Sequence, residues 1–78
     1  MQIGVKLIGR LGKYADNADR LILGKDAIIN EALSTLGLPD DQVGPVSLNG
    51  ELISKADQKT RLLQEGDSLT IMPPIKGG

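Results

Sequence analysis

Hydrophobic and polar positions alternate over the first ten residues of the chain. Three odd positions are apolar, Ile3, Val5 and Leu7, and the even positions carry Gln2, Gly4, Lys6 and Ile8. A period of two is typical of a strand with one buried face, so we predict a strand from Gln2 to Arg10. The same period at Leu21 and Leu23 predicts a second short strand. Residues 11–19 are rich in Gly, Asn and Asp and are interpreted as the connection of an opening hairpin.

A helical period replaces the alternation in the middle of the chain. The apolar positions are Ile29, Ala32, Leu33 and Leu36, and the polar positions between them are Asn30, Glu31, Ser34 and Thr35. This spacing predicts a helix with one buried stripe. We expect Asp26 to cap its start, because a carboxylate there can accept hydrogen bonds from the free N–H groups of the first turn. Gly37, Leu38 and Pro39 predict its end, since Gly adopts a left-handed conformation, Leu folds back and Pro prevents continuation.

The second half of the chain returns to short alternating stretches. Val46 and Leu48 are predicted to point inward on a third strand. The Asn-Gly pair at 49–50 predicts a tight hairpin, because both residue types tolerate positive φ. A short return strand through Leu52 and Ile53 completes this hairpin. The stretches "PDDQVG" and "SKADQKT" are polar and are interpreted as surface loops.

A final strand is predicted after a turn at residues 65–67. On it Leu69 and Ile71 point inward, and Thr70 and Met72 point outward. The order of elements is therefore strand, strand, helix, strand, short strand, strand. The helix has one apolar stripe and the sheet one apolar face, so each buries the other. We predict an α+β domain over residues 1–72, a β-grasp (ubiquitin-like) fold in which a mixed sheet of four to five strands covers one main helix.

Composition narrows the possible chemistry. The 78 residues suffice for one domain, and because Tyr14 is the only aromatic residue the core must be aliphatic. The formal charge is −1 and no basic run occurs, which argues against a nucleic-acid partner. The sequence contains no cysteine and no histidine. Disulfides, Cys-ligated metals and most catalytic constellations are thereby excluded, so we expect no metal site, no bound cofactor and no catalysis by the chain itself.

Other candidate features of the sequence give little evidence of function. The Gly4–Gly9 spacing of a phosphate-binding loop lies in a strand pattern and lacks the following Lys-Ser/Thr, so close packing or a bulge is the better interpretation. The aspartates at 16, 19, 40 and 41 lack the spacing of a calcium loop. Exposed basic residues, Lys6, Arg10, Lys13 and Lys25, suit an ordinary surface or an acidic partner. Without a secretion signal or a membrane-spanning run, we expect a cytoplasmic protein with no membrane partner.

The end of the chain, "MPPIKGG", carries the most specific signal. Pro73 and Pro74 each hold φ near −65°, which favours an extended exit from the domain. Gly77 and Gly78 lack β-carbons and could enter a slot too narrow for other residues. Residues 73–78 are therefore predicted to be a flexible tail that presents the α-carboxylate, which is unreactive until another, ATP-using enzyme activates it. Chain ends also carry Gly and Pro simply because disorder is tolerated there.

With these residues in view, the chain resembles the ubiquitin-like sulfur-carrier family, which includes the small subunit of molybdopterin synthase and the thiamine-thiazole sulfur carrier. The likeness is carried by "VKLIGRLGKY", "DAIINEALSTLGL", "VSLNGELI" and "LLQEGDSLTIMPPIKGG", which together cover almost the whole chain. A Gly-Asp turn, a strand, Pro-Pro, an aliphatic residue and Gly-Gly at these distances form a fairly specific signature.

The resemblance implies a mechanism and partners. An adenylating enzyme would activate Gly78, next to Gly77, with ATP, and a persulfide donor would convert the adenylate to a thiocarboxylate. The Pro-Pro-aliphatic ending is closest to the molybdopterin branch, whose large subunit would receive the tail. The residues assigned to partner binding are Ile8, Met72, Pro73, Pro74, Ile75 and Lys76. Ile8 is also interpretable as a single exposed aliphatic residue without function.

Alternatives stay open at this point. The molybdopterin branch often carries Phe where Met72 stands, although a flexible Met can also fill an apolar surface. Tungsten-cofactor, thiamine, cysteine or tRNA-thiolation routes are alternative acceptors of the sulfur. The same adenylate would serve a protein modifier joined to lysine amines. A third possibility is a β-grasp interaction module whose tail has no role, because a fold alone does not define a function.

Overall fold

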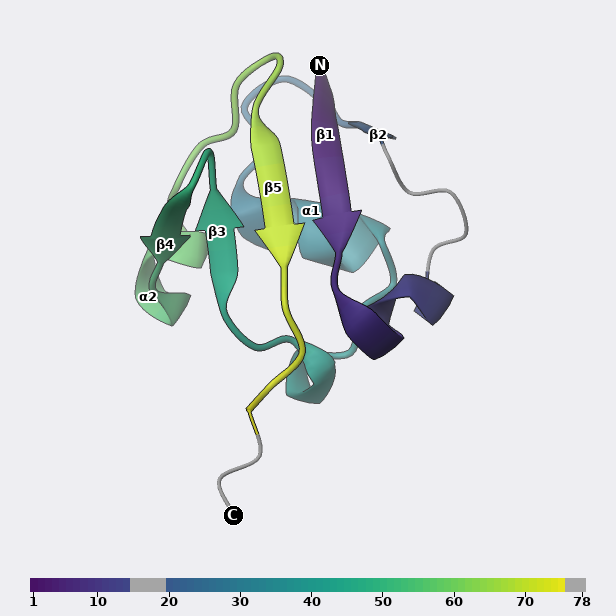
Figure 1. Cartoon of the computed structure of the whole chain (residues 1–78). Coiled ribbons are helices and arrows are strands. Elements are labelled where there is room, and N and C mark those ends of the chain that lie inside the picture. The colour runs from purple at the N-terminus through teal and green to yellow at the C-terminus, as the bar shows by residue number, and fades with distance from the viewer. Residues whose placement is uncertain (15–19, 76–78) are drawn as a thin grey trace.

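The computed structural model describes residues 1–14 and 20–75 and contains one five-stranded sheet in the order β2-β1-β5-β3-β4 (Figure 1). The strands are β1 (Gln2–Leu7), β2 (Arg20–Ile22), β3 (Val46–Leu48), β4 (Glu51–Ile53) and β5 (Ser68–Ile71). The helices are α1 (Ile29–Thr35) and the short α2 (Lys55–Gln58), with 3₁₀ segments η1 (Gly9–Tyr14) and η2 (Asp40–Gln42). The predicted β-grasp architecture is confirmed.

The first and last strands pair in parallel at the centre of the sheet. β1 pairs with β5 from Gly4↔Ser68 to Leu7↔Ile71, and each of these central strands has an antiparallel neighbour on its other side, β2 beside β1 and β3 beside β5. Both predicted hairpins are confirmed, β1 with β2 and β3 with β4. Asn49 and Gly50 have φ of 52° and 87°, the positive values that a tight turn between β3 and β4 requires.

The core lies between one face of the sheet and α1, which Figure 1 shows behind β5 and β1. Every buried hydrophobic side chain among the described residues is aliphatic, as the composition predicts. The predicted helix stripe is buried: Ile29, Ala32, Leu33 and Leu36. The inward strand positions are buried as well: Ile3, Val5, Val46, Leu48, Leu69 and Ile71. Burial of this aliphatic surface is the main force that holds the helix to the sheet.

The prediction for the start of the helix is wrong. Asp26 has φ of 65° and no capping role, and α1 begins at Ile29 after an extended Ile28. The reason is a tertiary contact: Ile28 forms an antiparallel bridge with Leu62, and the Leu63 N–H donates to the carbonyl of Ala27 at 2.8 Å. This pairing holds Ile28 extended, so the helix starts later than the local signal suggests.

The predicted end of the helix is confirmed. Gly37 has φ of 74°, and its N–H donates to the carbonyl of Ser34 at 3.0 Å. Leu38 folds back, since its N–H donates to the carbonyl of Leu33 at 3.2 Å and its side chain is buried. These two bonds satisfy carbonyl groups that the last turn of a helix leaves without intrahelical partners.

Three predictions about connections are also corrected. β1 ends at Leu7 instead of Arg10, and the chain turns into η1, where Leu11 is completely buried. The stretch interpreted as a loop after β4 contains α2, capped by the Ser54 hydroxyl, which accepts a 3.1 Å bond from the Asp57 N–H. Gln58 of α2 is buried and donates to the carbonyl of Ile53 at 3.3 Å. The connection "PDDQVG" contains η2, and residues 15–19 lie outside the described part of the chain.

Within the described residues, no helix is both long enough and apolar enough to cross a membrane. Over the same residues no group of three or more acidic side chains is placed to hold a metal ion.

Candidate functional site

The candidate site is the segment that continues β5 out of the sheet. β5 lies between β1 and β3, and Met72–Ile75 leave from its end (Figure 1). Met72, Pro73 and Pro74 are half-buried, whereas the side chain of Ile75 is 86% exposed. Exposure to solvent therefore increases along this segment, and its first three residues still pack against the domain.

Backbone hydrogen bonds hold the start of this segment. The Met72 N–H donates to the carbonyl of Pro45 at 3.0 Å, and the Gly44 N–H donates to the carbonyl of Met72 at 2.7 Å. On the other side, the Ile8 N–H donates to the carbonyl of Ile71 at 3.0 Å. The hydrogen-bond ladder thus runs one step past the ends of β3 and β5, so the path of the chain through Met72 is defined.

Gly44 sits in very close contact with the two prolines. A β-carbon built on Gly44 would lie 2.6 Å from the carbonyl carbon of Pro73 and 2.7 Å from the nitrogen of Pro74, and closer still to the Pro73 oxygen. Separations under 3 Å between such atoms essentially never occur in proteins, so this position has room for glycine alone. Gly9 faces the same segment with more space, since its β-carbon would lie 3.9 Å from Cγ of Pro73.

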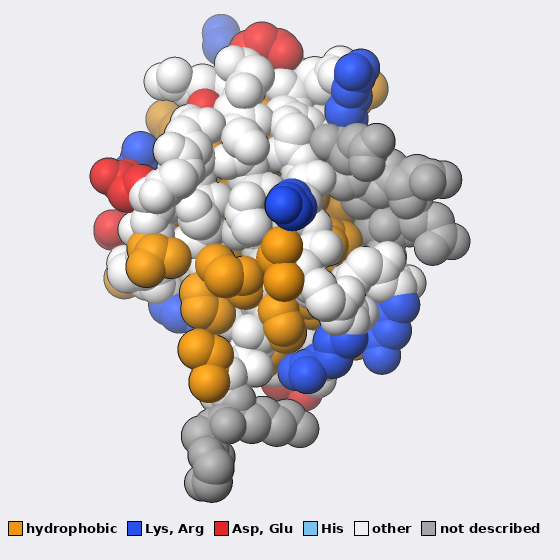
Figure 2. All heavy atoms as spheres, viewed as in Figure 1, with side chains coloured by type: hydrophobic (Ala, Val, Ile, Leu, Met, Phe, Trp, Pro, Cys, Tyr) orange, Lys and Arg blue, Asp and Glu red, His pale blue; other side chains and the backbone are white. Residues whose placement is uncertain are grey.

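An apolar surface surrounds the start of the segment. We call it the tail-root patch and define it as Ile8, Leu52, Met72, Pro73, Pro74 and Ile75. Figure 2 shows hydrophobic side chains gathered on this end of the outer sheet face, next to the exit of the chain. Leu52 belongs to that face because it pairs with Ser47 between buried neighbours, and its side chain is 71% exposed. A cluster of exposed or half-exposed apolar groups is typical of a protein-binding surface.

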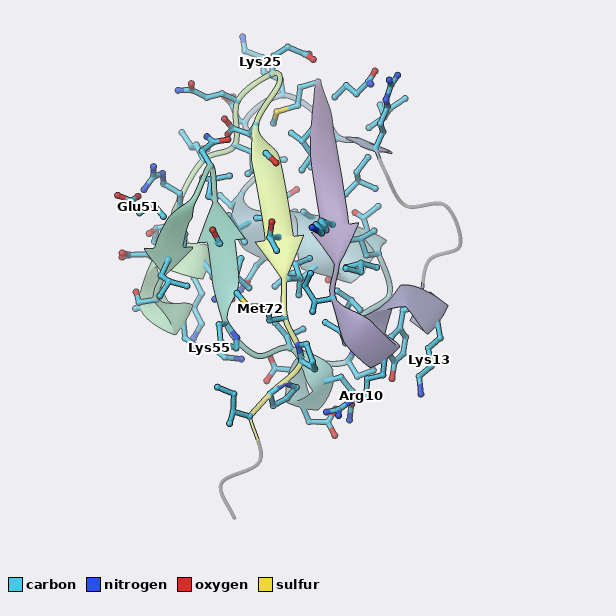
Figure 3. The ribbon with its side chains drawn as sticks, viewed as in Figure 1. Arg10, Lys13, Lys25, Glu51, Lys55 and Met72 are labelled. Carbon is cyan, nitrogen blue, oxygen red and sulfur yellow. The ribbon has the colours of Figure 1, made fainter. Side chains whose placement is uncertain are left out.

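Basic side chains border the tail-root patch. Lys6 lies on the outer face of β1, and Arg10 and Lys13 lie on η1; all three are exposed. In Figure 3, Arg10 and Lys55 extend on opposite sides of Met72. Lys55 Nζ lies 3.7 Å from Asp40 Oδ1, an ion pair so exposed that it contributes little to stability. The patch therefore combines an apolar centre with a largely positive border.

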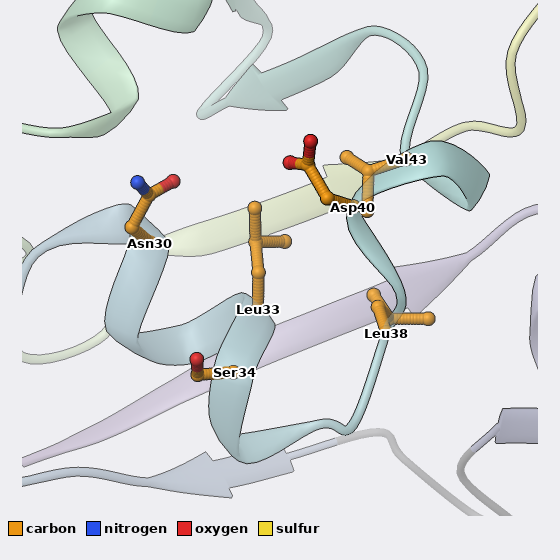
Figure 4. Close-up of a pocket in the computed structure, with 6 residues that line it drawn as sticks. All are labelled: Asn30, Leu33, Ser34, Leu38, Asp40 and Val43. Atoms are coloured by element: carbon orange, nitrogen blue, oxygen red, sulfur yellow. The ribbon is translucent and has the colours of Figure 1, made fainter.

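A hollow of about 300 Å³ lies between α1 and η2, close to this end of the molecule (Figure 4). Its lining residues are Asn30, Leu33, Ser34, Leu38, Asp40 and Val43. The only charged group among them is Asp40, which is paired with Lys55. Ser34 contributes the only hydroxyl to this lining, and no histidine, lysine or cysteine contributes to it.

The structure brings together five of the residues that the sequence assigns to partner binding. Ile8, Met72, Pro73, Pro74 and Ile75 all belong to the tail-root patch. The other assigned positions, Lys76, Gly77 and Gly78, lie outside the described residues.

Sequence reasoning missed two residues of the site. Leu52 was assigned only to a return strand, although its alternation with Ile53 points it outward. Gly44 was placed in a surface loop, and nothing in its neighbours along the chain signals its contact with Pro73.

Comparison with protein families identifies the chain. The model of the ThiS family matches residues 5–78, nearly the full length. The chain belongs to the ThiS family. Members of this family are small, non-catalytic sulfur carriers with a ubiquitin-like fold, so the resemblance stated from the sequence is confirmed at that level.

Solved structures support the fold of this ThiS-family chain. Small archaeal modifier protein 1 of Haloferax volcanii is 23% identical, with 95% of this chain and 98% of that chain covered and a TM-score of 0.71. The thiamine biosynthesis protein ThiS of Geobacter metallireducens is 21% identical, with both chains fully covered and a TM-score of 0.69. A chain in the complex of subunits 1 and 2 of the molybdopterin-converting factor of Helicobacter pylori is 23% identical, with both chains fully covered and a TM-score of 0.61. No protein of curated function matches the sequence.

Proposed function

We propose that this ThiS-family protein carries sulfur as a thiocarboxylate on Gly78, and that the sulfur is used in molybdopterin biosynthesis. The observation that carries the proposal is the clamped, glycine-lined exit of Met72 and the two prolines from the centre of the sheet. Such an exit supports presentation of the last residues to another protein. The family match extends through residue 78, which agrees with a functional Gly-Gly ending.

The proposed chemistry begins with activation of the carboxylate. An oxygen of the Gly78 carboxylate attacks the α-phosphorus of ATP, the bond to the β-phosphate breaks, and pyrophosphate leaves. The product is an acyl-adenylate, a mixed anhydride with AMP as a good leaving group. The terminal sulfur of a persulfide then attacks the acyl carbon and AMP departs. A thiol cleaves the resulting acyl disulfide, which leaves the thiocarboxylate on Gly78 and a disulfide on the donor.

A separate enzyme is required because the chain has no evident means of activating its own carboxylate. An α-carboxylate with a reference pKa of roughly 3.3–3.7 is ionised at neutral pH and is a poor electrophile. The sequence has no histidine or cysteine to act as a base or nucleophile. Activation therefore falls to an adenylating enzyme, which supplies the ATP site.

The tail-root patch is the proposed docking surface for that enzyme and for the sulfur acceptor. Its apolar centre, with Leu52 71% and Ile75 86% exposed, would be covered in the complex. The border of Lys6, Arg10 and Lys13 favours an acidic rim on the partner. Because the patch surrounds the exit of the tail, docking there would place Gly78 within reach of the partner's active site.

Molybdopterin biosynthesis is the pathway we favour. The support is the Pro73-Pro74-aliphatic ending, which is similar to that of the molybdopterin branch of the sulfur carriers. Met72, half-buried beside Ile71, would take the docking place that a Phe often holds in that branch. The structure from H. pylori is a complex of two subunits of a molybdopterin-converting factor, which fits a larger subunit as a partner. Thiamine, tungsten-cofactor, cysteine and tRNA-thiolation routes are the alternative destinations of the sulfur.

Mass spectrometry tests the carrier function directly. The purified chain is incubated with its adenylating enzyme, ATP and a persulfide-generating desulfurase, and the intact protein is weighed. We expect the mass increase that corresponds to one oxygen replaced by sulfur, located on Gly78 by fragmentation. An unchanged mass, with the same enzymes active on another carrier, would contradict the proposal. Sulfur transfer to a pterin precursor by a purified large subunit then tests the pathway.

A protein modifier is the second candidate, since one of the similar structures is a small archaeal modifier protein. The two functions share the adenylate and differ only in whether sulfur or a lysine amine attacks it. Cellular proteins carrying Gly-Gly remnants of this chain on lysine would support the modifier.

A further inference from the structure

We propose that Gly44 is a positioning residue that sets the direction in which the tail leaves the domain. The inference rests on the proposed carrier function and names the residue that makes tail presentation possible. Gly44 donates its N–H to the carbonyl of Met72 at 2.7 Å, and its missing side chain leaves the space through which Pro73 and Pro74 pass.

The atoms of the tail that lie against Gly44 are backbone atoms, so a clash with them cannot be relieved by rotating a side chain. The atoms that a β-carbon at Gly44 would meet are the carbonyl carbon and oxygen of Pro73 and the nitrogen of Pro74. A flexible side chain could rotate away, but these atoms move only if the whole segment moves. Adding one methyl group must therefore shift residues 73–74 and the backbone around Gly44 relative to each other.

Prolines restrict the backbone of both segments that meet here, Gly44-Pro45 and Pro73-Pro74. The contact between them therefore favours one direction for the exit of the chain. Pro45, which follows Gly44, has its own φ fixed, and its ring disfavours a helical conformation of the residue before it. Pro73 has its own φ fixed and is followed by Pro74, so it is restricted in the same way. Hydrogen bonds join these two stiff segments, from Gly44 to Met72 and from Met72 to Pro45. We call this arrangement the clamp, and it gives the tail one preferred direction of exit.

Other glycines of the chain provide a contrast. A β-carbon on Gly24 would meet nothing within 4 Å, and Gly24 does not have positive φ, so alanine should be accepted there. Gly37, Gly50 and Gly66 have positive φ and would be strained for a different reason. Gly44 is thus distinguished by its contact with the tail, and Gly24→Ala is the matched control.

The consequence should appear in catalysis by the adenylating enzyme. In the tail-root patch, the exposed Leu52 and the half-buried Ile8 do not belong to the displaced segment, so docking should change less than the reaction step. The Gly78 carboxylate, however, would reach the α-phosphate of ATP from an altered direction. Displacing a reacting group by about 1 Å can cost roughly 100-fold in rate. We expect kcat to fall about tenfold or more with KM within about threefold.

The experiment measures ATP–pyrophosphate exchange by the adenylating enzyme with wild-type chain, Gly44→Ala and Gly24→Ala. A lower kcat for Gly44→Ala alone supports the inference, and equal kcat for both variants overturns it. A wild-type chain that supports no exchange would instead contradict the carrier function, because that result does not involve Gly44. A merely structural effect on docking would raise KM and leave kcat unchanged, which also overturns the inference.

Amide hydrogen exchange on the wild-type chain provides a test that holds even if Gly44→Ala fails to fold. We expect the amides of Gly44 and Met72 to be protected like those of β5, and the amide of Ile75 to exchange fast. Fast exchange at Met72 would overturn the clamp. Where Gly44→Ala folds, protection at Met72 should be lost in that variant and retained in Gly24→Ala.

Discussion

The side-chain amide of Asn49 donates a 3.0 Å hydrogen bond to Oδ1 of Asp67 and so ties together two turns far apart in the sequence. Asn49 also accepts a 2.8 Å bond from the Ser68 N–H, and Oδ2 of Asp67 accepts a 2.8 Å bond from the Gln64 N–H. The turn between β3 and β4 is thus joined to the turn that starts β5. This link positions β5, the strand that leads to the tail, against β3.

The link predicts the effect of two substitutions at one position. Asn49→Ala loses the side-chain bonds and places at φ of 52° a residue that tolerates this conformation less well than asparagine, so it should lower the free energy of unfolding by about 2 kcal/mol. Asn49→Gly loses the same bonds but accepts the backbone conformation, so its loss should be about 1 kcal/mol. Urea denaturation measures both values. Equal losses would show that the backbone conformation contributes nothing.

The tail-root patch predicts that binding can be weakened without loss of stability. Leu52→Ser should raise KM for the adenylating enzyme about five- to tenfold, because an exposed apolar anchor is lost from the interface. Its free energy of unfolding should change by less than about 0.5 kcal/mol, since the side chain is largely exposed. Ile22→Ser is the control, because Ile22 is 77% exposed and lies on β2 beside Gln2, far from the tail. A similar effect of both substitutions would argue against the patch.

The basic border predicts a salt-dependent interaction. Arg10→Glu should raise KM for the adenylating enzyme at low ionic strength, and the effect should shrink as salt increases, because exposed charges are screened. Lys25→Glu changes the net charge equally, and Figure 3 shows Lys25 at the opposite end of the molecule from Arg10. Kinetics at two salt concentrations compare the variants. If Lys25→Glu has the same effect, net charge and not the border attracts the enzyme.

The tail itself predicts a separation of fold from function. Deletion of Gly77 and Gly78 should abolish adenylation and thiocarboxylate formation, since the reacting carboxylate is then carried by another residue. Circular dichroism and thermal unfolding should match the wild-type chain. Full biological function of the truncated chain would favour an interaction module, in which the β-grasp surface acts alone.

Local patterns predicted most of the elements correctly for a physical reason. The alternation around Val5 and Leu69 and the helical spacing from Ile29 reflect which side of each element meets the core. The left-handed Gly37 and the Asn-Gly turn at 49–50 depend on the φ preferences of single residues, so the residue types alone are enough to predict them. The same is true of the two prolines in the exit segment. The tail residues 76–78, outside the described part, remain a prediction from sequence.

The sequence by itself therefore determined the order of the strands and the main helix along the chain, the aliphatic core and the motif at the chain end. Only the tertiary structure decided where α1 begins, because Ile28 pairs with Leu62 instead of joining the helix. It also decided that Gly44 faces Pro73 across the sheet end and that Leu52 joins the tail-root patch. These relationships join residues distant along the chain. They depend on packing and strand register, which no local pattern of residues encodes.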